Sequence, residues 1–398
     1  MPTRTSRKRH SLAGYPTRLI AYLWLVVSLL SLSACGEQNA TAYDTLQKSI
    51  EDNLEKTGQA TQGTMQLVIK PEYKEGYTPD PETETIIRAL NGLQLYTETR
   101  IDQTSDRQEI TLKGSFPYQN QNVSFHVDLM GEGDVYYLRI KELSTLGIPE
   151  LQAILPFFLN KWIKLDAQQW TELDGQTPNY PEQYNISPPT LNRFMTEALL
   201  VIFKALGPDY FSLVSADQKA PPAVAKQKAS QAVIFQANKE KIAEIIKRLA
   251  TSAVPALYDL IEQPEYAEIK KIIHEQDASI PKSRAAYEQM LKDNEESFEK
   301  ALNDFQNAVE TFDIELTYWL DSKNIMVASA ANMTIILDDG MLKETTENGL
   351  DDLSKLTIQL SAEEGIELFD EAPPFQFDYP PAAEDTIDLG AMQQSVAP

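Results

Sequence analysis

The chain has 398 residues, of which 42% are hydrophobic, so it is long and apolar enough for one large or two ordinary domains. Acidic residues outnumber basic ones by 59 to 35, and a surface of this sign repels phosphate backbones and anionic headgroups. The composition therefore excludes nucleic acid as an expected partner. The single cysteine excludes an intramolecular disulfide, so the fold must be stabilised by packing.

The first 34 residues have the pattern of an export signal. A basic segment with five Lys or Arg residues and no acid precedes an apolar run over 19–30. The run is interrupted by serine and ends in small residues, which is typical of a signal and not of a permanent membrane span. Without these five basic residues, 30 basic face 59 acidic side chains, a formal charge of −29.

The signal ends in Leu32-Ser-Ala-Cys35-Gly36, which resembles the lipobox of bacterial lipoproteins. The resemblance implies a signal peptide over 1–34, cleavage before Cys35, and acyl chains, including palmitate, on that residue. Two or three acyl chains hold a protein stably on a membrane. We therefore expect an extracytoplasmic protein tethered through 35–42 to the cell membrane, or to an outer membrane if one exists. The alternative is a free cysteine after an ordinary signal or transmembrane segment.

After the tether, a helix is expected over 43–58, in which apolar residues recur every four positions. From Thr64 to about Lys141 the apolar period changes to two, and clusters of turn residues separate the segments. This pattern is typical of an antiparallel meander with one solvated face. We expect about five strands there.

Helices dominate from 142 to about 310. Ser187 followed by proline predicts a helix that ends at Gly207, and Asn238 predicts the cap of another, with Pro255 as a kink. The sequence of residues 231–237 predicts a strand. One long helix is predicted over 283–309.

Strands return at 312–320, 325–337 and 356–360, with a hairpin turn at 338–340. The order of strands, helices and strands predicts the α+β class, with one antiparallel sheet completed by both ends of the chain. We expect a single domain over 43–380, a helical insertion at about 167–310, and an extended or disordered tail over 381–398. A split into two domains near residue 180 is the alternative.

Motifs of catalysis and metal binding are weak. The mature chain has only His126 and His274, far apart, and His126 is expected to face solvent from a strand. Ser279-Ile-Pro-Lys282 matches the S-x-x-K pattern, but its proline would spoil the helical turn that aims lysine at serine. We predict no catalytic residue, no metal, no cofactor and no enzymatic activity.

The helical region carries more large apolar side chains than are needed to pack its helices against one face of a sheet. They predict either an ordinary core or a cavity for an apolar ligand. The candidate wall residues are Phe194, Leu199, Ile202, Phe203, Leu206, Tyr287, Leu291 and Phe298.

Three segments also occur in the order typical of a known superfamily: Gly133 to Arg139, Lys161 to Asp166, and Leu316 to Asp321. In this respect the chain resembles LolA-like lipoproteins, including the LppX/LprG class. The resemblance implies a curved antiparallel half-barrel with helices across its concave face, enclosing a cavity for lipid, and no catalytic residues. The leading hypothesis is therefore a non-enzymatic binder or carrier of lipid or another apolar ligand. The alternative is a cell-envelope interaction or sensing module without a small-molecule ligand.

Overall fold

The computed structural model describes ten segments of the chain. They are residues 42–53, 56–79, 81–119, 121–133, 135–144, 149–166, 188–222, 228–276, 280–338 and 352–388. The expected signal peptide, Cys35 and the 338–340 turn beyond Asp338 lie outside these residues. Among the helices of the described segments, none is long and apolar enough to span a membrane.

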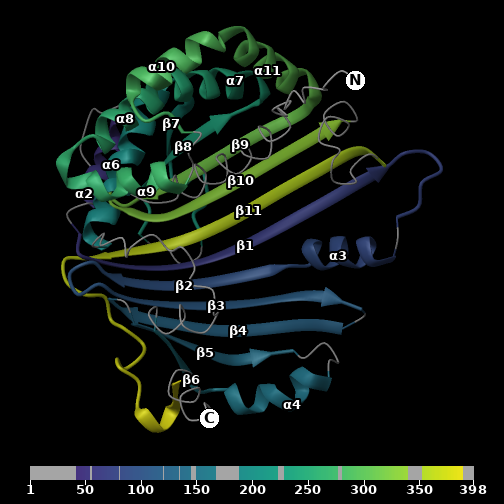
Figure 1. Cartoon of the computed structure of the whole chain (residues 1–398), viewed down its shortest axis with the longest axis vertical. Coiled ribbons are helices and arrows are strands. Elements are labelled where there is room, and N and C mark those ends of the chain that lie inside the picture. The colour runs from purple at the N-terminus through teal and green to yellow at the C-terminus, as the bar shows by residue number, and fades with distance from the viewer. Residues whose placement is uncertain are drawn as a thin grey trace, which may run out of the picture.

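All twelve strands of the described residues join one curved sheet that does not close on itself (Figure 1). Their order across the sheet is β12-β6-β5-β4-β3-β2-β1-β11-β10-β9-β8-β7. The strands are β1 (Gly58–Tyr73), β2 (Gln94–Asp102), β3 (Arg107–Tyr118), β4 (Gln121–Glu132), β5 (Val135–Leu143), β6 (Trp162–Asp166), β7 (Phe211–Ser215), β8 (Gln231–Ala237), β9 (Val309–Leu320), β10 (Met326–Asp338), β11 (Leu353–Phe369) and β12 (Thr386–Asp388).

The first strand of the described residues, β1, and the second-last, β11, meet at the centre of the sheet. Strand β1 pairs with β2 on one side and with β11 on the other, both antiparallel, from Gly58 opposite Phe369 onwards. Strands β2 to β6 then continue as a meander, and β7 to β10 extend the sheet beyond β11. The α+β class and the prediction of one sheet built from both ends of the chain are confirmed.

The helices are unevenly distributed over this sheet. Figure 1 shows α2 and α6 to α11 gathered over the half that contains β7 to β10, whereas α3 and α4 lie beside strand ends in the other half. The helices are α2 (Ala42–Asn53), α3 (Pro81–Asn91), α4 (Pro149–Phe158), α6 (Pro188–Leu206), α7 (Lys239–Arg248), α8 (Val254–Ile261), α9 (Ala267–Gln276), α10 (Arg284–Asp293) and α11 (Glu295–Ala308).

Helix ends follow local chemistry. Helix α6 starts at Pro188 and stops before Gly207, whose φ of 74° suits glycine. Helix α7 is capped by the side chain of Asn238, which accepts a hydrogen bond from the Lys241 N–H at 3.1 Å. A π-helical turn, Leu249–Ala253, precedes Pro255 in α8. The prediction of one helix over 283–309 is wrong, because Asn294 leaves helical geometry and separates α10 from α11.

The main hydrophobic core lies between α2, α6, α7 and the half-sheet beneath them. Leu46 and Ile50 of α2 meet Phe203 of α6, all at 3% exposure or less. We call the face of the sheet that meets these helices the helix face, and it carries Phe312 and Leu316 of β9. Burial of this apolar surface, at about 25 cal/mol per Å², is the main stabilising contribution here.

The chain ends by crossing the opposite face of the sheet. Strand β12 pairs in parallel with β6, with Thr386 opposite Trp162. The expected boundary at residue 380 therefore falls inside the ordered fold, because the proline-rich segment before it packs on the sheet and leads into a strand. Residues 389–398 of the expected tail lie outside the described segments.

Candidate functional site

The helix face differs sharply between its two halves. On β8 to β11 its apolar side chains are buried under the helices, as Phe235, Leu316 and Leu360 show with 5%, 4% and 5% exposure. The same face continues onto β2 to β5, as one row of paired residues across the sheet shows. This row runs from Leu316 through Ala331, Ala362 and Met65 to Leu95. Along this one row, side chains are therefore buried on β8 to β11 and partly exposed on β2 to β5.

We call the helix-face side chains of β2 to β5 the apolar floor. They are Leu95, Ile101, Ile110, Leu112, Phe125, Val127, Leu129, Tyr136, Leu138, Ile140 and Leu143. Every one of them is partly or fully exposed, and none belongs to a cluster of buried core residues. A contiguous apolar surface that the described residues leave partly exposed is typical of an interaction or ligand site.

A pocket of about 220 Å³ lies where the apolar floor meets the covered half. Small residues at the centre of the sheet make room for it: Gly63 in β1, Ala331 in β10 and Ala362 in β11. Met65 and Leu95 line its apolar walls. A side chain at Gly63 would approach the Glu363 carbonyl oxygen to 2.9 Å, so glycine is needed at this point of the pairing.

One carboxyl group faces this apolar pocket. Glu364 of β11 pairs with Ser329 and Gly63, which places it on the helix face beside Thr97 and Tyr318. Burial raises the pKa of Glu364, and a hydrogen bond from Thr61 opposes that effect. No ion pair joins it to a basic side chain of the described segments, so only the hydrogen bond from Thr61 opposes the effect of burial.

The sequence-predicted wall residues lie elsewhere. Leu199, Phe203 and Leu206 are buried in the main core with Phe298 packed against it. Ile202 is also buried, and Phe194 contacts the Tyr266 ring at 5.2 Å.

The ring centroids of Tyr287 and Tyr258 lie 5.6 Å apart, and the Tyr287 hydroxyl donates to the Ala250 carbonyl at 2.9 Å. Leu291 is partly exposed on α10. None of the eight candidates lines the pocket described above. The structure thus brings four of them together as packed core and places the open apolar surface on the other half of the sheet.

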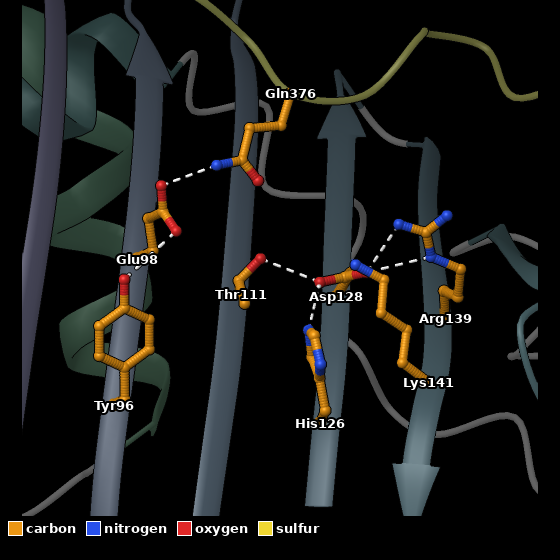
Figure 2. A network of polar contacts seen from close by, with 8 residues as sticks. All are labelled: Tyr96, Glu98, Thr111, His126, Asp128, Arg139, Lys141 and Gln376. Carbon is orange, nitrogen blue, oxygen red and sulfur yellow. Dashed lines mark hydrogen bonds and ion pairs between the residues drawn. The ribbon is translucent and has the colours of Figure 1, made fainter.

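The opposite face of β2 to β5 carries a polar network around Asp128 (Figure 2). The carboxylate is fully buried and accepts from Arg139 Nε at 3.0 Å and Nη2 at 2.7 Å, while Lys141 Nζ lies at 2.8 Å. Thr111 Oγ1 donates at 2.9 Å, and His126 Nε2 lies at 3.3 Å. The carboxylate is therefore paired and hydrogen-bonded, as a buried charge must be.

These partners determine the titration of Asp128. Burial alone raises the pKa of the carboxyl group, but hydrogen bonds from Lys141, Arg139 and Thr111 outweigh burial and hold the pKa below its usual value. The stabilisation is fully present above about pH 4, the ordinary pKa of an unfolded aspartate, and is lost as pH falls through the lowered pKa.

We therefore predict a pH-dependent difference between the wild type and Asp128→Asn. The wild type should be more stable near pH 6, and the difference in free energy of unfolding should shrink as pH falls from about 5 to about 2, because protonation removes the ionic partner. Urea denaturation at each pH measures this difference. A difference that stays constant over the whole range would contradict the ionic role of Asp128.

A C-terminal strap, residues 371–385, covers part of this polar face. Buried Glu109 accepts from the backbone N–H groups of Gln376 at 2.7 Å and Phe377 at 3.0 Å, and Arg107 donates to Glu109 and to the Phe377 carbonyl. The guanidinium of Arg139 lies 4.9 Å from the Phe377 ring. Glu109, Arg107 and Arg139 thus hold the strap against the polar face of the sheet.

His126 lies in a polar groove of about 650 Å³ beside this network. It is on the polar side of β4, as predicted, but it contacts Asp128 instead of pointing freely to solvent. Burial lowers its pKa, Lys141 and Lys113 act in the same direction, and Asp128 opposes them. Ser124, on the same face, donates to Glu142.

Neither Glu364 nor the apolar floor was singled out from the sequence. The alternation of apolar residues predicts that Leu95, Ile110, Leu112 and Val127 lie on one face of the sheet. It does not predict whether helices cover this face, because coverage depends on where the helical insertion packs. Among the described residues, no group of His, Cys, Asp and Glu side chains is arranged to hold a metal ion. No family model matches the chain, and no curated protein sequence matches it either.

Proposed function

We propose that this protein is a membrane-tethered, extracytoplasmic lipoprotein that binds the hydrocarbon chain of a lipid or another apolar ligand on the apolar floor. The observation that carries the proposal is the contrast between the buried and uncovered halves of one apolar sheet face. Binding works through burial of apolar surface, at about 25 cal/mol per Å², without covalent chemistry. The LolA-like resemblance of the sequence supports the same function.

The dimensions favour an elongated ligand. The pocket of about 220 Å³ is smaller than the roughly 300–1,000 Å³ of a typical small-molecule site. A ligand larger than this pocket would extend along the apolar floor, from Met65 and Leu95 towards Phe125 and Leu143. A hydrocarbon chain has this shape.

The strand ends beside α3 and α4 supply a route to a membrane. Both helices lie at the same ends of the strands in Figure 1, and their large apolar side chains point to solvent: Ile86 is 51%, Ile154 53% and Phe157 75% exposed. Leu143, at the end of β5, is 36% exposed. An apolar rim next to an apolar floor suits the transfer of a chain from a bilayer.

The membrane tether gives the first prediction of this proposal. Cys35→Ser should abolish partitioning into the detergent phase after Triton X-114 extraction, because this thiol is the only attachment point for lipid in the sequence. Partitioning equal to that of the wild type would show that the protein is held at the membrane by other means.

The binding function is tested by filling the pocket. The uncharged fluorophore N-phenyl-1-naphthylamine should gain fluorescence with the mature wild-type chain, and Ala362→Leu should weaken its binding at least about tenfold because leucine occupies the pocket. Ser361→Leu is the matched control, since Ser361 is exposed on the opposite face of β11. Absence of uptake by the wild type, or equal loss in both variants, would contradict the proposal.

A further inference from the structure

The carboxyl group of Glu364 in the pocket bears on which amphiphiles bind there. We infer that the pocket selects ligands whose polar end is a hydrogen-bond donor, such as an alcohol, amide or ammonium group, and discriminates against a free carboxylate. The inference rests on the proposed function and names the chemical class of its ligand.

The surroundings of Glu364 give the first step of the argument. The neighbouring side chains come from four strands and are neutral: Thr61 of β1, Thr97 of β2, Tyr318 of β9 and Ser329 of β10. Burial raises the pKa of the Tyr318 phenol, so it stays protonated. No cation of the described segments pairs with Glu364, and no described residue that lines the pocket is basic, so this lining offers no partner to an incoming anion.

The second step is the cost of a carboxylate ligand in this place. If a ligand carboxylate lies beside Glu364 and the two groups share one proton, one negative charge remains between them. That charge is removed from water and has no cationic partner. Burial already raises the pKa of Glu364 for the same reason. A free fatty acid should therefore bind poorly with its carboxylate next to Glu364.

The third step is the gain offered by a donor. An alcohol or amide brings no charge and donates a hydrogen bond to the Glu364 oxygen, while an ammonium group adds a charge-assisted bond. The small residues Gly63 and Ala362 leave room for the head of such a ligand beside the carboxyl group. Donor-bearing amphiphiles therefore supply a hydrogen-bond partner for Glu364, which has no ionic partner among the described residues.

A displacement assay with three ligands of equal chain length tests this inference. The mature chain with Cys35→Ser is loaded with N-phenyl-1-naphthylamine in about 0.15 M salt, which screens the overall charge of the protein. Dodecan-1-ol and dodecylamine should displace the fluorophore at concentrations at least about tenfold lower than dodecanoate. Glu364→Gln should bring dodecanoate within about threefold of dodecan-1-ol and should weaken dodecylamine.

Glu367→Gln is the matched control, because it removes the same charge from a residue of the same strand whose side chain is exposed on the other face and which does not line the pocket. It should keep the wild-type order of the three ligands. Equal displacement by dodecanoate and dodecan-1-ol in the wild type would overturn the selectivity, as would equal changes in both glutamine variants. Absence of fluorophore uptake would instead overturn the proposed function, and this inference with it.

Discussion

Replacing Asp128 by alanine is expected to lower the free energy of unfolding by about 3–5 kcal/mol. The substitution leaves Arg139 and Lys141 without the buried carboxylate that they contact at 2.7 and 2.8 Å, and it removes the acceptor of Thr111. Chemical denaturation with tryptophan fluorescence measures the loss.

Glu132→Ala is the control for this prediction, because Glu132 lies on the same strand and its side chain is exposed. Its effect should stay within about 0.5 kcal/mol. A loss in Asp128→Ala no larger than that of Glu132→Ala would show that the network in Figure 2 contributes little to the fold.

A charge on the apolar floor is expected to abolish ligand binding without unfolding the protein. Leu112 is partly exposed and pairs with Thr97 and Val127, so Leu112→Glu should cost only about 0.5–1.5 kcal/mol while it prevents a hydrocarbon chain from lying there. Leu316→Glu, on the covered half of the same face, should cost more than about 4 kcal/mol, because Leu316 is 4% exposed in the main core. Thermal unfolding and fluorophore uptake are measured together.

Lys113→Glu provides the control for binding, since the exposed Lys113 is the next residue and faces the polar side of β3. It should retain uptake. If Leu112→Glu unfolds the protein as strongly as Leu316→Glu, the apolar floor is ordinary core and the proposed site is wrong.

Much of the fold could be predicted because its signals are local. Apolar alternation along 64–141 predicts the meander, and Asn238 predicts a helix cap. Alternation returns after residue 311 and predicts further strands, which can complete a sheet only by pairing with strands from the first part of the chain. The break at Asn294 was missed because the apolar stripe of α10 and α11 continues across it. Strand β12 was missed because three residues after a proline-rich segment carry no strand pattern.

The site was less accessible to sequence reasoning because it depends on long-range placement. The bulky stripes of α6 and α10 predict a cavity wall. The structure buries Phe203 and Leu206 in the main core, and the partly exposed apolar surface is on strands. The partners of Asp128 follow from the register of β3, β4 and β5, including a bulge between His126 and Val127. Neither fact has a local signal in the sequence.

The most direct test of the proposed binding site is photolabelling of the mature protein with a long-chain alcohol that carries a diazirine on its alkyl chain. Mass spectrometry of the proteolytic fragments then locates the label. The proposed site predicts labels on β2 to β4, around Leu95, Leu112 and Val127, and their loss when unlabelled dodecan-1-ol is added. Labels concentrated on α6 and α10, or labels that unlabelled alcohol does not reduce, would contradict binding on the apolar floor.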